Sequence, residues 1–256
     1  MVILALTDLR GRREYLVGLP EVCRSTGAEA VVFAGNMTDG GARLAEWLQA
    51  RAESRTADRQ KPAAAMQEQT DIALYEAFYD VMGQLQIPVF IVPGHFDAPE
   101  RLYLQAVLNH ETIAPQVYLV HRSFAEIGSS FVVSGFGGRL TDGARETVLV
   151  LEYPAWEAKF AFDFLHRLER PRILVFHTPP QAEKVDLEDN RHVGHPVVNP
   201  LIKTFAPTFA FCGHALDGRG KQIIGDTLVV NPGPMALGDY AVLDTRTRDV
   251  FFGNLR

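Results

Sequence analysis

Five acidic, amide or imidazole side chains recur at one kind of position in the sequence, just after a short apolar run: Asp8, Asn36, His95, His177 and His214. Side chains of these types can bind ligands, hold metal ions or exchange protons. A glycine or a threonine stands beside each of them. In α/β sheets, ligands bind beyond the carboxyl ends of the strands, where a rigid backbone holds polar groups in place. We therefore expect these side chains to meet at one edge of the fold.

The elements that must position these side chains are short β-rich runs that alternate with helical patterns. The runs predict buried or half-buried strands at residues 2–7, 30–34, 88–92, 117–120, 131–135, 172–176, 208–212, 227–231 and 240–243. Helical patterns cover residues 41–55, 68–86, 99–109, 155–168 and 196–204. The late strands follow one another closely with Gly, Pro and Asn turns, which is typical of antiparallel pairing. The sequence predicts an α/β fold with a mixed sheet.

The order of the polar strand ends resembles that of the calcineurin-like metallophosphoesterase family. The blocks of that family read approximately D-x-H, G-D-x-x-D, G-N-H-D/E, a lone H and G-H-x-H. This sequence has Asp8-Leu9-Arg10, Gly35-Asn36-Met37-Thr38-Asp39, Gly94-His95-Phe96-Asp97, His177 and Gly213-His214-Ala215-Leu216. The match covers nearly the whole chain and identifies it as a divergent member with altered metal-site motifs. The resemblance implies two mixed β-sheets packed face to face with flanking helices, a four-layer α/β/β/α sandwich.

The altered blocks fall on the machinery that holds the first of the family's two metal ions. By resemblance, Asp8 remains a ligand, but Arg10 and Leu216 stand where the family has histidines. A guanidinium has only donors and a fixed charge, so it cannot coordinate a cation. We expect this first site to be empty, with Arg10 either pairing with Asp8 or binding a phosphate oxygen of the substrate.

The second metal site keeps four candidate ligands, which by the same resemblance are Asn36, His95, His177 and His214. Three imidazoles and an amide oxygen suit zinc, manganese or a similar divalent ion, with a position open to water. The resemblance therefore implies one divalent metal ion at a mononuclear site, although the sequence also leaves open that no metal is bound.

The position of the catalytic histidine of the family is taken by Phe96, which has no proton to give. Asp97, which orients that histidine in the family, remains. We assign catalytic roles to Asp8, Arg10 and Asp97, and name His192 and His195 as weaker candidates for substrate binding. The leading hypothesis is a metal-dependent phosphate-ester hydrolase acting on a small phosphate-containing ligand. The alternative is a catalytically inactive protein of the same fold that binds a phosphate-bearing ligand or a protein partner, so whether the chain is an enzyme stays open.

Simpler interpretations exist for several of these residues. Asp8 and Asp39 could merely cap the turns or helices that follow them. Phe96 could fill the space of the lost histidine or provide a stacking surface for a flat ligand.

Composition limits the function further. The 256 residues fit a single domain, 1–256, with a helical or loop insertion at about 40–70. The net charge of -6 disfavours nucleic-acid binding. Cys23 and Cys212 lack the spacing of a disulfide framework or a thiolate zinc site.

No apolar stretch approaches the length of a membrane span, and no leader pattern is present, so we expect a cytoplasmic protein. The sequence does not predict an oligomeric state.

Overall fold

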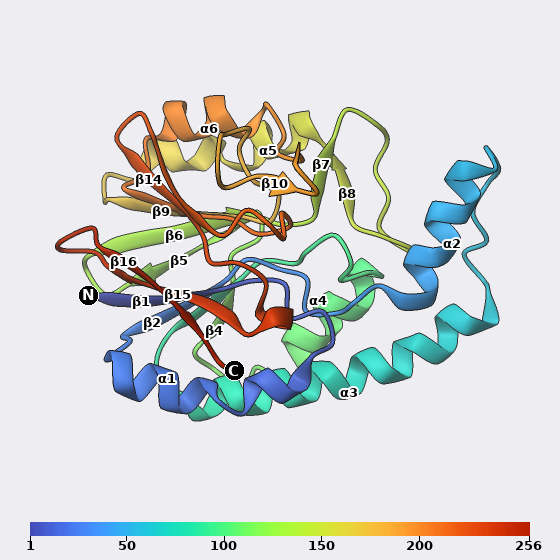
Figure 1. Cartoon of the computed structure of the whole chain (residues 1–256), viewed down its shortest axis with the longest axis horizontal. Coiled ribbons are helices and arrows are strands. Elements are labelled where there is room, and N and C mark those ends of the chain that lie inside the picture. Colours follow the sequence, from blue (N-terminus) through green and yellow to red (C-terminus); the bar gives the residue numbers. More distant parts are fainter.

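A computed structural model describes the whole chain, residues 1–256. Two six-stranded sheets pack face to face, and helices cover their outer faces (Figure 1). Both sheets mix parallel and antiparallel neighbours. The predicted α/β fold with two mixed sheets and flanking helices is confirmed.

The first sheet contains the strands that lead to Asp8, Asn36 and His95. In spatial order its strands are β16 (Val250–Asn254), β15 (Asp239–Asp244), β1 (Val2–Leu6), β2 (Ala30–Phe33), β3 (Val89–Ile91) and β4 (Val117–Leu119). The strands from β1 to β4 run parallel, so their carboxyl ends lie at one edge. Strand β15 adds antiparallel to β1 and brings the end of the chain beside its beginning.

The second sheet contains the strands that lead to His177 and His214. Its spatial order is β13 (Gly220–Ile224), β14 (Thr227–Asn231), β12 (Phe209–Phe211), β9 (Arg172–Phe176), β6 (Phe131–Phe136) and β5 (Phe124–Ile127). The four central strands run parallel to one another, and each outer strand pairs antiparallel with the central strand beside it. The central strands are mostly buried and rich in apolar residues, as expected where both faces of a sheet are covered.

Three apolar clusters hold these layers together. One lies between the first sheet and its helices, which are α1 (Leu19–Thr26), α3 (Pro62–Gln84) and α4 (Glu100–Asn109). A second lies between the second sheet and the helices α5 (Ala155–Ala161) and α6 (Val198–Phe205). The third fills the space between the sheets and includes Phe90, Val133 and Phe211. None of the helices is both long enough and apolar enough to cross a membrane.

Helix α2 (Gly41–Ala52) extends away from the sheets, and the loop of residues 53–61 returns the chain to α3 (Figure 1). We call α2 together with this loop the arm. Pro62 opens α3 at a position where its missing N–H costs nothing. The predicted insertion at about 40–70 corresponds to the arm and the first turns of α3. Helix α3 begins at Pro62, six residues before the start of the helix predicted at 68–86.

Several short elements were absent from the sequence prediction. They are α1, β5, β13 and β16, the 3₁₀ segments, the pair β7 (Arg139–Thr141) and β8 (Glu152–Pro154), and the hairpin of β10 (Leu187–Glu188) and β11 (Arg191–His192). The predicted helix at 155–168 is divided into α5 and the 3₁₀ segment Asp163–Arg167. Most of the missed strands are short or lie at sheet edges, where alternating apolar patterns are weak.

Candidate functional site

The five side chains that follow strands gather where the carboxyl ends of the two sheets meet. Asn36 Nδ2 donates a 2.8 Å hydrogen bond to Asp8 Oδ1, and the backbone N–H of His214 donates a 2.9 Å hydrogen bond to Asp8 Oδ2. The ring of His214 lies 5.2 Å from that of His177 and 5.7 Å from that of His95, measured between centroids. The structure therefore brings together all five positions.

The backbone at this edge adopts conformations that non-glycine residues rarely take. Asp8, Arg10, Asn36 and His214 have φ angles of 51°, 47°, 59° and 68°. Left-handed conformations of this kind cost free energy and persist where the surrounding structure imposes them. Their concentration at one edge of the sheets points to a functional site, independently of any motif.

Two glycines allow the strand ends to approach closely. A Cβ atom on Gly94 would lie 2.0 Å from the backbone nitrogen of Asn36. A Cβ atom on Gly35, whose φ is +93°, would lie 2.6 Å from Gly94 and 2.8 Å from Nδ1 of His177. Larger residues would push the loop after β2 away from the loop after β3 and open the site.

Asp8 is the centre of a buried polar network. Besides its contacts with Asn36 and His214, it accepts hydrogen bonds from Thr7 Oγ1 at 2.9 Å and from Arg10 Nε at 3.1 Å. Burial alone would raise the pKa of Asp8, but the charge of Arg10 and the hydrogen bonds hold that pKa below its ordinary value. The expectation that Arg10 pairs with Asp8 is confirmed. Asp8 therefore does more than cap the turn that follows it, because its partners include Asn36 and His214 from distant parts of the chain.

Asn36 is fixed at both ends of its amide. Its oxygen accepts the backbone N–H of Phe96 at 2.8 Å, while its nitrogen faces the carboxylate of Asp8. Because a backbone N–H can only donate and a carboxylate only accepts, this orientation is determined by its partners. The oxygen keeps one further lone pair.

The three histidines present buried nitrogens that have no hydrogen-bond partner: Nδ1 and Nε2 of His95, Nε2 of His177 and Nδ1 of His214. Nδ1 of His177 is hydrogen-bonded to the carbonyl oxygen of Ala34 at 2.7 Å, which leaves Nε2 as the free acceptor. Burial lowers the pKa of each ring, that of His177 to about 4. All three imidazoles are therefore neutral near pH 7, the form in which they can coordinate a cation.

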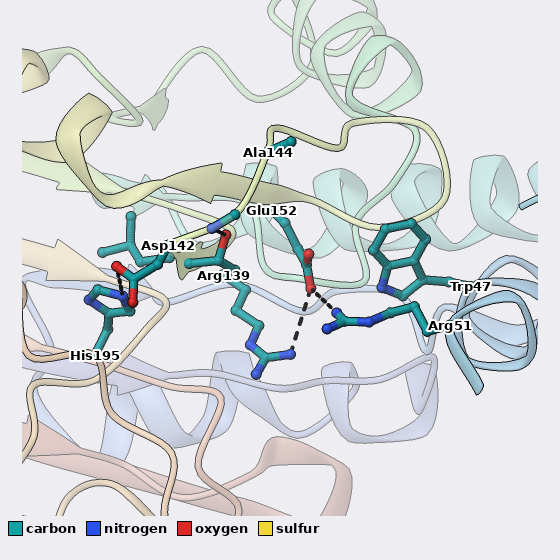
Figure 2. Close-up of a pocket in the computed structure, with 10 residues that line it drawn as sticks. Trp47, Arg51, Arg139, Asp142, Ala144, Glu152 and His195 are labelled. Atoms are coloured by element: carbon teal, nitrogen blue, oxygen red, sulfur yellow. Dashed lines mark hydrogen bonds and ion pairs between the residues drawn. The ribbon is translucent and has the colours of Figure 1, made fainter. Parts of the chain in front are cut away.

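Glu152, at the start of β8, is a site residue that the sequence analysis missed. It is buried, and its Oε1 lies 3.3 Å from Nε2 of His95. Oε1 also lies 3.6 Å from Arg139 and 3.7 Å from Arg51 of the arm (Figure 2). Nothing local in the sequence separates Glu152 from other acidic residues, because its neighbours in space come from three distant segments. The carboxylate lies beside Nε2 of His95 without the geometry of a hydrogen bond, so both atoms stay without a hydrogen-bond partner.

Phe96 and Asp97 have structural contacts in this arrangement. Asp97 accepts the backbone N–H groups of Gly94 and Thr38 at 2.7 and 2.9 Å, and burial raises its pKa to about 6. The guanidinium carbon of Arg10 lies 4.9 Å above the Phe96 ring. Phe96 is buried, so it packs beneath Arg10.

The remaining candidates lie farther out. His192 is half exposed and hydrogen-bonds through Nδ1 to Asp186 at 2.9 Å, which raises its pKa. His195 lies 3.6 Å from Asp142 and lines the same pocket as Glu152 (Figure 2). The structure thus brings His195 toward the site and gives His192 an acidic partner of its own. Asp39 makes no capping hydrogen bond to α2, whose first residue is preceded by Gly40.

The donor chemistry of the site fits one divalent metal ion. Three neutral imidazoles with unpartnered, buried nitrogens are ligands that zinc and similar ions prefer. As the side chains stand, however, no three His, Cys, Asp or Glu groups form a ready-made metal cluster. Binding a metal would require the rings to turn toward a common point.

Comparisons with known proteins give a consistent result. A family model described as metallophosphoesterase, calcineurin superfamily, matches residues 1–255. One solved crystal structure has a TM-score of 0.92 and 33% identity, covering 100% of this chain and 99% of that chain. The crystal structure of TT1561 of Thermus thermophilus has a TM-score of 0.78 and 28% identity over 100% of this chain and 99% of its own.

A curated relative shares a shorter segment. The uncharacterized protein MJ1162 of Methanocaldococcus jannaschii is 40% identical over 78 residues, which are 28% of this chain and 34% of the relative. The match therefore spans about a third of the length of that relative.

Proposed function

Because the chain belongs to the metallophosphoesterase family of the calcineurin superfamily, we propose that it hydrolyses esters of phosphate with the help of one divalent metal ion. The observation that carries the proposal is the set of three neutral, buried imidazoles with unpartnered nitrogens at the meeting edge of the sheets. We assign His95, His177 and His214 as the ligands, with the remaining lone pair of Asn36 as a further donor. When bound, a divalent ion would polarise a phosphoryl oxygen and lower the pKa of a bound water.

The chain itself supplies two further functions at this site. Arg10 is partly exposed, and its Nε is engaged by Asp8, so its terminal nitrogens can bind a phosphate oxygen. Asp8 balances the charge of Arg10 and, through the N–H of His214, fixes the loop that carries that ring. Asp97 holds the loop of His95 in place through its two backbone hydrogen bonds.

A second candidate function is favoured by one observation. Phe96 stands where the family has its proton donor, and Arg10 occupies the position of a ligand to the first metal. Both features suit a catalytically inactive protein that binds a small phosphate-bearing ligand or a protein partner with this pocket. The experiments below separate the two functions. For neither do we propose nucleic acid as the ligand.

The first experiment measures metal content and turnover together. Protein purified without chelator is analysed for zinc and manganese, then assayed with aryl phosphate mono- and diesters. We expect about one metal per chain and turnover, both lost in His214→Ala and both kept in the control His166→Ala, which changes an exposed histidine far from the site. Wild-type protein that contains no metal and shows no turnover would contradict the hydrolase and favour the catalytically inactive binding protein.

The second experiment varies the leaving group. General-acid catalysis is worth roughly 10²–10⁴-fold, and Phe96 cannot supply it. Turnover should therefore fall steeply from esters of acidic phenols to esters of simple alcohols. Equal rates for nitrophenyl and methyl esters would mean that another residue donates the proton.

A further inference from the structure

Beside the three histidines lies a pocket of about 480 Å³ between the arm and the β7–β8 pair. Trp47 and Arg51 of α2 line one side, and Arg139 and His195 line the other (Figure 2). Glu152 forms the wall between this pocket and the site, because the same carboxylate oxygen approaches His95 and the two arginines. Glu152 borders both the pocket and the ring of His95, so a ligand in the pocket lies next to the candidate metal ligands.

Two guanidinium groups in the pocket have unused donors. Arg51 and Arg139 lie 3.7 and 3.6 Å from Oε1 of Glu152, too far for normal hydrogen bonds. The only protein contacts of these two guanidinium groups with a carboxylate are these long ones, and Oε1 of the buried Glu152 has no hydrogen-bond partner either. The terminal nitrogens of both arginines can therefore donate to a ligand in the pocket.

The neighbouring arginines of the arm are different. Arg55 donates to Glu46 at 2.5 Å and to Glu53 at 2.6 Å. Arg59 donates to Glu146 at 2.6 Å, which ties the arm to the loop before β8. These two residues are occupied by internal ion pairs, whereas Arg51, on the same arm, faces the pocket with its donors free.

The charges around the pocket favour an anion. Two guanidinium charges face the single carboxylate of Glu152, which leaves one positive charge unbalanced. Asp142 also lines the pocket, but its side chain is 93% exposed, so water and salt screen its charge more than that of the buried Glu152. Trp47 adds an aromatic wall, and the guanidinium carbon of Arg51 lies 5.6 Å above its ring, which restrains Arg51 at the mouth of the pocket.

We propose that Arg51 and Arg139 bind a second anionic group, a carboxylate or a phosphate, on the part of the substrate that leaves. The substrate class is then an organic phosphate whose alcohol or phenol portion carries a negative charge of its own. This inference rests on the proposed function, because it places the ester phosphate at the histidines. Guanidinium groups bind carboxylates and phosphates with the same fork of donors, so both sources of the charge need to be tested.

The test uses non-hydrolysable probes and does not depend on turnover. The chain has two tryptophans, so Trp156→Phe leaves Trp47 as a fluorescent reporter in the wall of the pocket. This protein is titrated with three phenylphosphonates that carry a carboxylate, a second phosphonate or a neutral carboxamide at the para position. We expect the two anionic probes to bind about tenfold or more tightly than the carboxamide. The stronger of the two identifies the preferred second group.

Variants of Arg51 and Arg139 test whether these two residues cause the preference for the anionic probes. Arg51→Gln and Arg139→Gln, each in the Trp156→Phe background, should bring the three affinities together. Both side chains are about half exposed, at 58% and 45%, so these changes should leave the fold intact. The control Arg167→Gln, an exposed arginine on the far helix face, should keep the wild-type preference. Equal affinities for all three probes in the parent protein, or a preference that survives both variants, would overturn the proposal.

The binding result and the turnover result are separable. A preference for anionic probes without any turnover would retain the anion pocket and remove the hydrolase. Turnover with equal probe affinities would retain the hydrolase and remove the second anion site.

Discussion

Arg10 places a permanent positive charge beside the buried carboxylate of Asp8, at the edge where the carboxyl ends of the strands meet. The pair changes what the edge of the sheet can do, because the carboxylate is neutralised from within the chain. It also makes Asp8 dependent on Arg10, since burial would otherwise favour the protonated acid.

Replacing Arg10 by methionine should expose this dependence. We expect a loss of about 2 kcal/mol in the free energy of unfolding at pH 7, where Asp8 is charged. In the wild type the lowered pKa of Asp8 contributes stability above its unfolded value near 4, and this contribution disappears as the pH falls through the folded pKa. The difference between the two proteins, measured by urea unfolding, should therefore persist from pH 7 down to about pH 4 and shrink only at lower pH, where Asp8 becomes protonated in the folded wild type. Arg10→Lys is the control that keeps the charge, and an equal deficit in both variants would argue against a charge effect.

The three site histidines should make the protein sensitive to acid. Burial lowers the pKa of each, that of His177 to about 4, whereas the unfolded chain takes up protons near pH 6.5. Between these values the unfolded state binds more protons, so stability is present above pH 6.5 and is lost as the pH falls toward 4. Each histidine can contribute up to about 1.4 kcal/mol per pH unit. Asp97, with its pKa raised to about 6, acts in the opposite direction between pH 4 and 6 and offsets part of this loss.

Urea unfolding at pH 7, 6 and 5 in the presence of a chelator measures this dependence without any metal. The variant His177→Phe should show a shallower slope, by roughly the contribution of one histidine. The same slope in both proteins would mean that His177 is already protonated in the folded state.

The candidate site was partly readable from single residues. Asp8, Asn36 and the three histidines could be found because each follows an apolar strand, and parallel strands deliver their ends to one edge. Glu152 could not be found in that way. It reaches His95 from a strand of three residues, and its other neighbours, Arg51 and Arg139, have no pattern in sequence that links them to it.

At the scale of elements, the arm depends on a buried ion pair at its base. Arg43 of α2 and Asp71 of α3 are both buried, and a terminal nitrogen of Arg43 donates to the carboxylate of Asp71. The other guanidinium nitrogens of Arg43 have no partner. Pairs of this kind join elements specifically, although their desolvation offsets much of their attraction.

A double-mutant cycle should reveal that balance. Arg43→Met alone should destabilise the protein by about 3–5 kcal/mol, because it leaves the charge of Asp71 buried and unpaired. Adding Asp71→Leu should recover most of this loss, since an apolar contact replaces the pair. Thermal or urea unfolding of both single variants and the double variant provides the three differences. Additive losses would show that the two side chains act independently.

The predictability of the elements followed the strength of their patterns. The central strands were located within one or two residues, because runs such as those of β1 and β9 consist of consecutive buried apolar residues after the first position. β13 and β16 escaped detection, since Gly220, Lys221 and Gln222 in β13 and Gly253 and Asn254 in β16 interrupt the apolar pattern. The two-residue strands β10 and β11 carry no readable period at all.

At the scale of the whole molecule, the layer between the two sheets determines whether the chain unfolds as one unit. Phe90 from the first sheet and Phe211 from the second lie in the same buried cluster. The division of the chain into one domain stays a prediction, and this shared core makes it testable.

Phe90→Ala should destabilise the protein by about 3–5 kcal/mol through the cavity that it leaves. If the sheets unfold together, reporters on the two sides must move together. Trp47 belongs to the arm, which is joined through Arg43 to α3 on the first sheet, and Trp156 belongs to α5 on the second. The urea transitions of Trp156→Phe and Trp47→Phe, each with and without Phe90→Ala, should shift by equal amounts. A shift seen by one reporter alone would indicate two separately stable units.

The pairing of β1 with β15 has a consequence for folding during translation. Strand β1 is synthesised well before one of its two neighbours, which is formed by residues 239–244. At about 5–20 residues per second, roughly 10–50 s separate the synthesis of these partners. During that interval one hydrogen-bonding edge of β1, in a run that is apolar throughout, lacks its native partner. We therefore expect the first sheet to be completed only after translation has passed β15, and the nascent chain to be a natural client of chaperones that cover exposed strands.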